Sequence, residues 1–301
     1  MRLATFRIGD TTTWGAIAGD KVVDARDLGV ATAWPTLLDL VRSGPDAARD
    51  FASRVAERPR WKEHAGLRLL APIPQPPQNA VAVGLNYREH VTEAGHAPVG
   101  EDRGRPMLFT KSRSSIIGHE EGIRIDATAT SQVDWEVELT LVIGTGGRDI
   151  SEAQAWDHIF GYTIANDVSA RDLQFIDKRR PQFFQGKSLD TFCPLGPWIV
   201  TKDELPNVAD LRITLRVDGV TKQDGRTSQL IFSIPEIIAE VSRSRTIEAG
   251  ELILTGTPSG VGFTRTPPEF LTPGQVVECE IEGIGILRNP VIAADGTGRT
   301  P

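Results

Sequence analysis

The chain has 301 residues, of which 40% are hydrophobic, enough for one large globular domain or two smaller ones with a buried core. A formal net charge of −7, with no basic stripe, argues against nucleic acid or an acidic membrane as the main partner. No apolar run reaches the roughly 18 residues that span a bilayer, the N-terminus lacks the apolar segment of a signal peptide, and the two cysteines match no metal spacing, so we expect a cytoplasmic protein.

The N-terminal segment, residues 1–70, has the pattern of a small structural unit. Short strand patterns separated by glycine and aspartate turns are followed, over residues 33–58, by helical spacing that breaks near Gly44 and Pro45. Residues 71–78 are rich in proline, which favours an extended linker. We therefore predict a small N-terminal α/β domain over residues 1–70, then a linker, then a second domain that begins at residue 79.

The second domain opens with an apolar strand pattern that leads through Gly84 into a polar helix. His90 and Glu93 are three residues apart on this helix and are therefore neighbours. A carboxylate beside an imidazole orients the ring and raises its basicity, as a general base requires, although such pairs are also common on exposed helices. Residues 95–105 are polar and glycine-rich, which is typical of a lid over a site or of a simple loop.

The most informative stretch is a strand pattern in the middle of the chain. Glu136 and Glu138 point to the same face of this strand, so their side chains can converge on one ion or can simply form a solvated face. Asp167 ends a second predicted strand over residues 161–168. Two glutamates and an aspartate offer hard oxygen ligands, which suit Mg²⁺ and also Mn²⁺ or Ca²⁺. Asp134 lies two pleats from Glu138, so the three acidic residues of the first strand cannot easily share one ion.

Polar and charged residues follow these two strands. Arg171 and Gln174 are three apart on a predicted helical turn and therefore face alike. Their position just after Asp167 favours a functional site over a solvated face. Lys187 follows a glycine and precedes a turn-rich run, where a lysine is either an exposed surface charge or part of a site.

The remaining residues predict further strands, a helix and a loop. Alternation on either side of Asp218 and Gly219 predicts a hairpin, and residues 234–242 have the spacing of an amphipathic helix. The loop after residue 254 offers backbone N–H groups and the Thr257 hydroxyl to an anionic group, or is an ordinary junction between a strand and a turn. Residues 293–301 are expected to form a flexible tail.

Six motifs occur in an order that resembles the fumarylacetoacetate hydrolase family. They read GLNYREHVTE, DWEVEL, NDVSARDLQ, QGKSLDTFCPLGP, SQLIFSIPEII and LTGTPSGVG. Together they cover the predicted second domain, residues 79–292. The resemblance is to the bacterial 2-oxo acid and acylpyruvate hydrolases. It implies an α+β, mainly β fold, with twisted mixed sheets rolled around a metal site, and a homodimer.

The resemblance also implies a role for each candidate residue. A divalent cation, Mg²⁺ with Mn²⁺ or Ca²⁺ as alternatives, is expected on Glu136, Glu138 and Asp167, and not on Asp134. The residues expected to be catalytic are His90, Glu93 and Lys187. The residues expected to contact the substrate are Arg171, Gln174 and Thr257. The segment His119-Glu120-Glu121 belongs to no motif, and we interpret it as a turn.

This set of residues suits a metal-dependent hydrolase that cleaves a carbon–carbon bond in a 1,3-diketone or acylpyruvate during the catabolism of aromatic compounds or sugar acids. Two alternatives within the family stay open. They are an oxaloacetate-type decarboxylase and an isomerase or hydratase of the 2-hydroxyhepta-2,4-diene-1,7-dioate type. A third alternative, from another class, is a non-catalytic β module with a structural cation.

Overall fold

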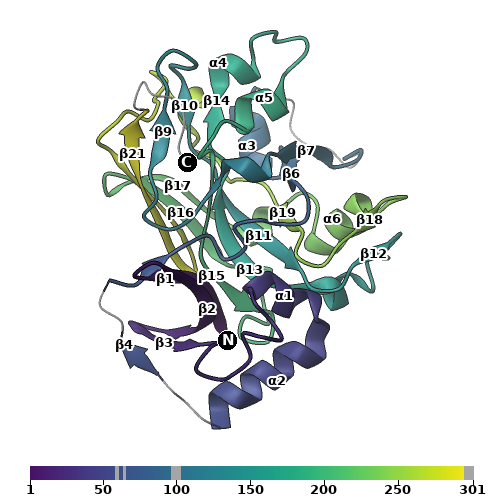
Figure 1. Ribbon diagram of the computed structural model, residues 1–301. Coiled ribbons are helices and arrows are strands. Elements are labelled where there is room, and N and C mark those ends of the chain that lie inside the picture. The colour runs from purple at the N-terminus through teal and green to yellow at the C-terminus, as the bar shows by residue number, and fades with distance from the viewer. Residues whose placement is uncertain (58–60, 64–65, 96–102, 295–301) are drawn as a thin grey trace.

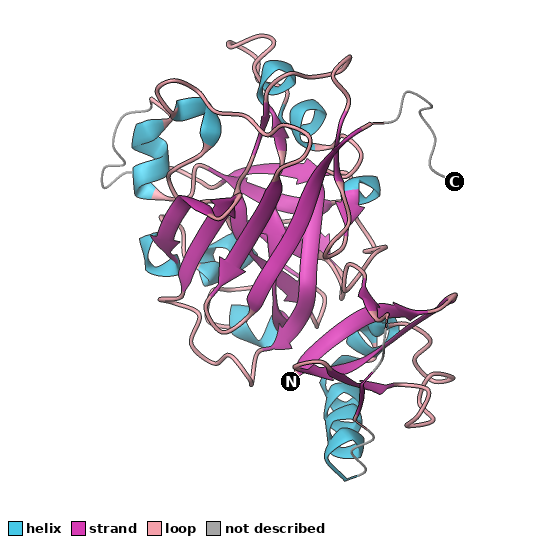
Figure 2. Cartoon of the chain, turned by 90° about the vertical axis from the view of Figure 1, so that its left-hand side faces the viewer, coloured by secondary structure: helices cyan, strands magenta, loops and turns pink. Residues whose placement is uncertain are grey.

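A computed structural model of the chain describes residues 1–57, 61–63, 66–95 and 103–294 (Figure 1). Within these ranges the protein is built mainly from β-strands with short helices around them, as the strand patterns predict (Figure 2). The predicted lid over residues 95–105 and the predicted tail over residues 293–301 fall largely outside the described residues.

One large mixed sheet runs through the described part of the chain. Its strands, from one edge to the other, are β4 (Lys62–Glu63), β3 (Lys21–Asp24), β2 (Thr11–Ala18), β1 (Arg2–Ile8), β15 (Cys193–Thr201), β13 (Ile159–Asn166), β11 (Val137–Ile143), β19 (Leu252–Leu254), β6 (Ala80–Gly84) and β7 (Met107–Lys111), with β5 (Arg68–Leu69) beside β1 and β8 (Ile116–Ile117) beside β15. Strand β1 pairs with β15, so the strands of the N-terminal segment continue the sheet that contains β11 and β13. The division into two domains stays a prediction.

A second sheet has five strands in the described residues. In spatial order they are β17 (Val220–Arg226), β16 (Arg212–Val217), β20 (Val276–Ile281), β21 (Gly285–Ala293) and β9 (Ile123–Ile125). Strands β16 and β17 form the predicted hairpin, and Asp218 and Gly219 at its turn have φ of 49° and 77°. Positive φ at both central positions is what a tight two-residue hairpin requires, and Asp-Gly tolerates it. Two short ribbons, β10 (Val133–Asp134) with β14 (Ser169–Ala170) and β12 (Gly147–Arg148) with β18 (Thr246–Ile247), complete the strands.

Strand β11 is buried on both faces. Val137, Leu139 and Leu141 pack in one hydrophobic cluster with side chains of the five-stranded sheet. On the opposite face, Val142 belongs to a second cluster, to which the N-terminal segment contributes many side chains. Glu138 lies on that same face, nearer the start of the strand. The N-terminal segment therefore covers one end of this face, and the two glutamates are left at the other end.

Short helices lie around the sheets, and those of the N-terminal segment pack in the hydrophobic cluster that contains Val142. The helices are α1 (Leu37–Arg42), α2 (Gly44–Glu57), α3 (Arg88–Glu93), α4 (Arg171–Gln174), α5 (Phe183–Lys187) and α6 (Ile234–Val241), with 3₁₀ turns at Arg113–Ser115, Ala155–His158, Thr227–Gln229 and Gly262–Thr264. The predicted break near Gly44 is confirmed, and α6 begins at a capping box formed by Ser233 and Glu236. No helix in the described ranges is both long enough and apolar enough to cross a membrane.

Candidate active site

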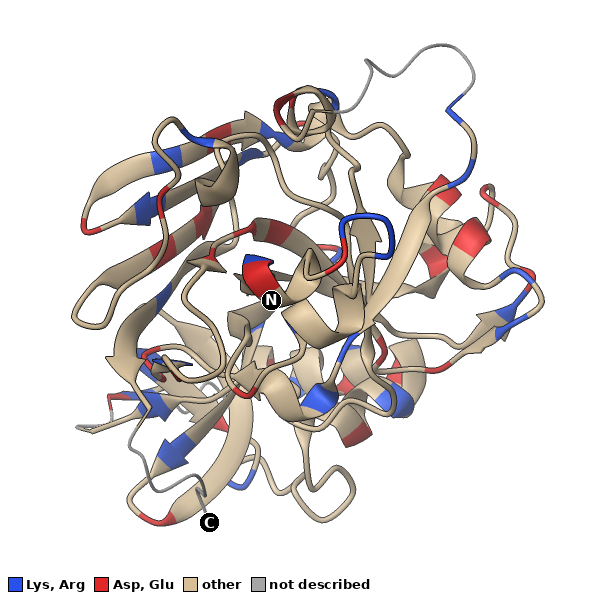
Figure 3. Cartoon of the chain, turned by 90° about the horizontal axis from the view of Figure 1, so that it is seen from above, with Lys and Arg blue, Asp and Glu red and all other residues tan. Residues whose placement is uncertain are grey.

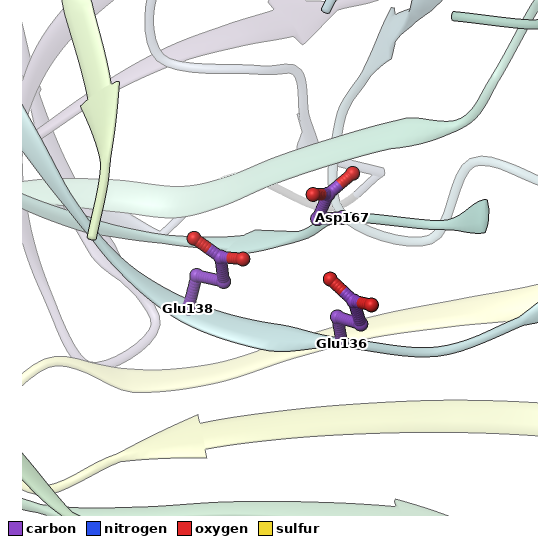
Figure 4. Close-up of side chains that lie close together, drawn as sticks. All are labelled: Glu136, Glu138 and Asp167. Carbon is purple, nitrogen blue, oxygen red and sulfur yellow. The ribbon is translucent and has the colours of Figure 1, made fainter. Parts of the chain in front are cut away.

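Three carboxylates converge where β11 and β13 meet. Glu136 immediately precedes β11, Glu138 is its second residue, and Asp167 follows the last residue of β13 (Figure 4). One oxygen from each carboxylate lies within 4.8 Å of the others. The side chains are almost fully buried, with residue exposures of 5%, 1% and 0%. The alternative of a solvated face is therefore wrong for these glutamates.

The charges of this carboxylate triad are not balanced evenly. Burial, together with the neighbouring charges of Asp167 and Glu136, raises the pKa of Glu138 well above its usual value. Burial acts in the same direction on Glu136, but the charges of Lys187 and Arg171 outweigh it and hold the pKa of Glu136 well below its usual range. Around Glu138, burial and the neighbouring carboxylates thus outweigh the positive charge of Lys187. A set of three carboxylate oxygens with unbalanced charge fits a hard divalent cation.

Lys187, the last residue of α5, lies against the triad and not on the surface. Its Nζ donates to Glu136 Oε2, Asp167 Oδ2 and Ser169 Oγ, each at 2.8 Å. These three acceptors engage all three N–H groups of the ammonium. Lys187 therefore acts on its surroundings mainly through its charge.

Arg171, the first residue of α4, joins the triad to a fourth carboxylate. It donates from Nε to Asp134 Oδ2 at 2.9 Å, from Nη1 to Gln174 Oε1 at 2.9 Å and from Nη2 to Glu136 Oε1 at 2.6 Å. The guanidinium also lies 4.4 Å from the centre of the Phe263 ring. Because a guanidinium has five N–H groups, two remain available to a ligand. Asp134 is the counter-ion of Arg171 and lies outside the carboxylate triad.

His90 and Glu93 form a pair on α3 in which His90 is buried and Glu93 is half-buried. The His90 residue is 6% exposed, and its Nδ1 lies 2.7 Å from Glu93 Oε1. The other Glu93 oxygen accepts the Gly260 N–H at 2.8 Å, which ties the pair to the loop after β19. With the Nδ1 proton donated to Glu93, Nε2 is the atom that can take or give a proton. The alternative of an exposed helix is wrong for His90.

The Thr257 hydroxyl is fully engaged as a donor. It donates to Val137 O at 2.9 Å and accepts from Gln223 Nε2 at 2.8 Å. Gln223, on β17, also accepts the Val137 N–H, and no pattern in the sequence pointed to this residue. Beside Thr257, the Gly256 N–H donates to Glu138 Oε2 at 2.7 Å. Without rotation of its side chain, the Thr257 hydroxyl has only one remaining lone pair to offer a ligand.

Most of the candidate residues face one cavity of about 620 Å³. The candidates that line it are His90, Glu136, Glu138, Arg171, Gln174, Lys187 and Thr257. Aromatic rings from Phe109, Phe175, Phe183 and Phe263 form part of its apolar wall. Glu93 and Asp167 lie behind this lining and hold His90 and Lys187. A cavity of this size with apolar walls and a few convergent polar groups suits a small molecule.

Outside this site, charged residues of both signs are spread over the described part of the chain. In the view of Figure 3, basic and acidic residues are interspersed. The segment His119-Glu120-Glu121 forms a turn, as predicted, and the Arg288 N–H donates to His119 Nδ1 at 3.1 Å. Glu120 pairs with Arg288, and Glu121 with Arg68. This segment therefore joins β21 to β5 and lies outside the carboxylate triad.

Comparisons with known proteins find relatives over most of the chain. The family described as "Fumarylacetoacetate (FAA) hydrolase C-terminal" matches residues 79–292. Over 226 residues, 75% of this chain and 73% of the relative, the sequence is 48% identical to the oxaloacetate tautomerase YisK of Bacillus subtilis (strain 168). Over 246 residues, 82% of this chain and 75% of the relative, it is 42% identical to the mitochondrial oxaloacetate tautomerase FAHD2A of Homo sapiens.

A solved structure extends the likeness to nearly the whole chain. It is the fumarylacetoacetate hydrolase of the psychrophile Exiguobacterium antarcticum, with a TM-score of 0.85 and 39% identity over 98% of this chain and 100% of that one. The fold expected from the motifs is thereby confirmed, including the mixed sheets around the carboxylate triad. The matched residues contain every element that carries the triad and the His90–Glu93 pair. The chain therefore belongs to the fumarylacetoacetate hydrolase family.

Proposed function

We propose that the protein is a divalent-cation-dependent enzyme that interconverts the keto and enol forms of an oxaloacetate-type 2-oxo acid. The observation that carries this proposal is the buried carboxylate triad and the His90–Glu93 pair at one cavity. Relatives named as oxaloacetate tautomerases support this chemistry. This reaction belongs to the isomerase alternative that the sequence left open, and the named relatives support it more than cleavage of a carbon–carbon bond.

The cation would be held by Glu136, Glu138 and Asp167, with Mg²⁺ as the first choice. When bound, it would act as a Lewis acid that stabilises negative charge on the oxygens of a 2-oxo acid. The buried charges agree with this arrangement. The buried carboxyl groups of Asp134, Glu136, Glu138 and Asp167 outnumber the three buried cationic side chains beside them, Lys111, Arg171 and Lys187. A divalent cation would offset this excess of acidic groups.

His90 is proposed to move the proton. Its Nε2 would take a proton from C3 of the keto form, and the negative charge would pass to the C2 oxygen, which is then protonated to give the enol. The reverse reaction uses the same groups. Glu93, which accepts the Nδ1 proton, holds the ring in place and stabilises the imidazolium that forms. Lys187 and Arg171 would stabilise the charge on oxygen, and Gln174 and Thr257 would contact the substrate.

Hydrolysis of an acylpyruvate is a second candidate. The solved structure named as a fumarylacetoacetate hydrolase supports it. The geometry of His90 supports it as well, because the same Nε2 could take a proton from water, and the resulting hydroxide would attack the distal carbonyl. Decarboxylation of oxaloacetate needs no such base, and the presence of a held imidazole therefore favours proton transfer. The homodimer expected from the resemblance stays a prediction.

The test follows the ultraviolet absorbance of the oxaloacetate enol in the presence of Mg²⁺, with EDTA as a control and with pyruvate measured in parallel. We expect the enzyme to accelerate loss of the enol without release of pyruvate. The His90→Ala variant should lose at least about 100-fold of this rate. The matched control is His158→Ala, since His158 lies outside the cavity lining and binds Thr145 O.

Each other outcome identifies another reaction. Release of pyruvate from oxaloacetate at the rate of enol loss would establish decarboxylation and overturn the proposal. Loss of the diketone band of an acylpyruvate, with no effect on oxaloacetate, would establish the hydrolase.

A further inference from the structure

Lys111 is a fully buried lysine that lies behind the carboxylate triad. It is the last residue of β7, it is 0% exposed, and it is not part of the cavity lining. Its Nζ donates to Asp167 Oδ1 at 2.6 Å, to Val168 O at 3.2 Å and to Lys187 O. These three acceptors account for all three N–H groups of the ammonium. A substrate in the cavity would not contact it.

Through these contacts, Lys111 fixes the orientation of Asp167. The two oxygens of that carboxylate are held by different ammonium groups, Oδ1 by Lys111 and Oδ2 by Lys187. Lys187 also binds Glu136 Oε2, so Oδ2 is the Asp167 oxygen on the side of the glutamates. If Oδ1 lost its partner, the Asp167 carboxylate could rotate about its Cβ–Cγ bond. Oδ2 would then no longer be held toward the place where the cation would bind beside the glutamates.

Lys111 also joins three segments that are distant in the sequence. The bond to Lys187 O holds the end of α5, and the bond to Val168 O holds the turn after β13. Nearby, Phe109 of β7 stacks on Phe183 of α5 with ring centres 5.4 Å apart. One buried side chain therefore sets the position of a candidate metal ligand and of the backbone of the active-site lysine.

We propose that Lys111 is a positioning residue of the metal site, which holds the Asp167 carboxylate and the end of α5 in the geometry that binds the cation. This inference rests on the proposed metal-dependent function. Groups that orient a metal ligand from behind typically change metal affinity or activity by about 10–100-fold when they are replaced. Lys111 belongs to this kind of group because its bond is to the ligand carboxylate itself.

An alternative role for Lys111 predicts an effect of the opposite sign. If Lys111 contributed only its positive charge, its removal would strengthen cation binding, because the charge that repels the cation would be gone. If it orients Asp167, its removal weakens cation binding, because the carboxylate is no longer held. The affinity for a divalent cation therefore separates the two roles.

The experiment measures Mn²⁺ binding by electron paramagnetic resonance in wild type, Lys111→Met and the control Lys202→Met. Methionine is nearly as long as lysine, one atom shorter, and carries no charge. Lys202 is exposed and binds Trp156 O, outside the triad and the cavity lining. We expect the Kd for Mn²⁺ to rise about 10–100-fold in K111M and to stay within about 2-fold of wild type in K202M. Urea midpoints measured on the same samples show whether K111M remains folded.

Unchanged or tighter Mn²⁺ binding by folded K111M overturns the role of Lys111 and leaves the proposed function intact. Absence of Mn²⁺ binding by wild type overturns both. If K111M does not fold, the wild type itself is tested by nuclear magnetic resonance of ¹⁵N-labelled lysine. Lys111 and Lys187 are the buried lysines of the described residues, so two ammonium signals should exchange slowly with water and should shift when Mg²⁺ is added. The Lys187→Met variant should remove one of them. Fewer than two protected signals, or a Lys111 signal that Mg²⁺ leaves unmoved, contradicts the inference.

Discussion

Replacing Arg171 with methionine tests how the buried charges of the site are balanced. The arginine is 3% exposed and donates to Asp134, Glu136 and Gln174. Methionine preserves much of the length but none of the charge, so the variant leaves two carboxylates without this partner. Breaking a buried ion pair by removing one member costs about 3–5 kcal/mol. We expect a loss of this size in the free energy of unfolding of the metal-free protein, and a fall in Tm on the order of 10 °C.

Urea denaturation in EDTA and in saturating Mg²⁺ measures this loss. A cation bound at Glu136 would supply positive charge to the carboxylate that has lost the Arg171 guanidinium. Mg²⁺ should therefore restore part of the stability that R171M loses. The variant is compared with Asp134→Asn and with the double variant. The two single losses together should exceed the loss in the double variant by about 1 kcal/mol or more, because both substitutions break the same bond. The matched control is Arg179→Met, an exposed arginine of the following loop, with an expected change within about 0.5 kcal/mol.

Two results would refute this reasoning. Losses that add for Arg171 and Asp134 would show that the two side chains are not energetically coupled. A fully stable R171M that has lost only activity would show that Arg171 acts on the substrate alone.

Three further predictions concern pH and metal. Burial and neighbouring carboxylates raise the pKa of Glu138 above its value of about 4.5 in the unfolded chain, so in EDTA the wild type should lose stability relative to Glu138→Gln as the pH rises above that value. Urea midpoints of the two proteins that run parallel from about pH 5 to 9 would contradict this. Burial lowers the pKa of His119, so the contribution of His119 to stability is present above about pH 6.5 and is lost as the pH falls. The His119→Gln variant should therefore show a weaker dependence of stability on pH, and an unchanged pH profile would contradict this prediction. Chelation by EDTA should lower activity more than about 100-fold, reversibly with Mg²⁺, while circular dichroism stays native; unfolding on chelation would favour a structural cation instead.

Much of the fold follows from local patterns in the sequence. The hairpin at Asp218 and Gly219, the break at Gly44 and the helix capped by Ser233 each depend on residues a few positions apart, and each is confirmed. The pairing of β1 with β15 joins Arg2 to Val200, and no local pattern indicates a contact between segments so far apart in the sequence.

Two members of the carboxylate triad, Glu136 and Glu138, could be predicted to face alike for the same reason, whereas the place of Asp167 beside them followed from the family resemblance. Glu136 and Glu138 are two residues apart on one strand, and the period of a strand places them on one face. The partners that hold Asp167 and Thr257 could not be predicted from the sequence. Lys111 lies 56 residues from Asp167, and Gln223 lies 34 from Thr257, so only the folded chain brings these pairs together. A lysine or a glutamine in a strand pattern also has no feature that distinguishes a buried side chain from an exposed one.

The pairing of β1 with β15 bears on how this chain can be cut or fused. Removing the N-terminal segment, residues 1–70, would uncover the backbone of β15 at Ile199 and Val200, which β1 now covers. It would also uncover the side chains of Val142 and Phe160, which pack in a cluster with Leu3. A freshly exposed strand edge beside apolar side chains is a template for association between molecules. We therefore expect the N-terminal strands to protect the protein against aggregation, and we expect a truncated version to be recovered as insoluble material.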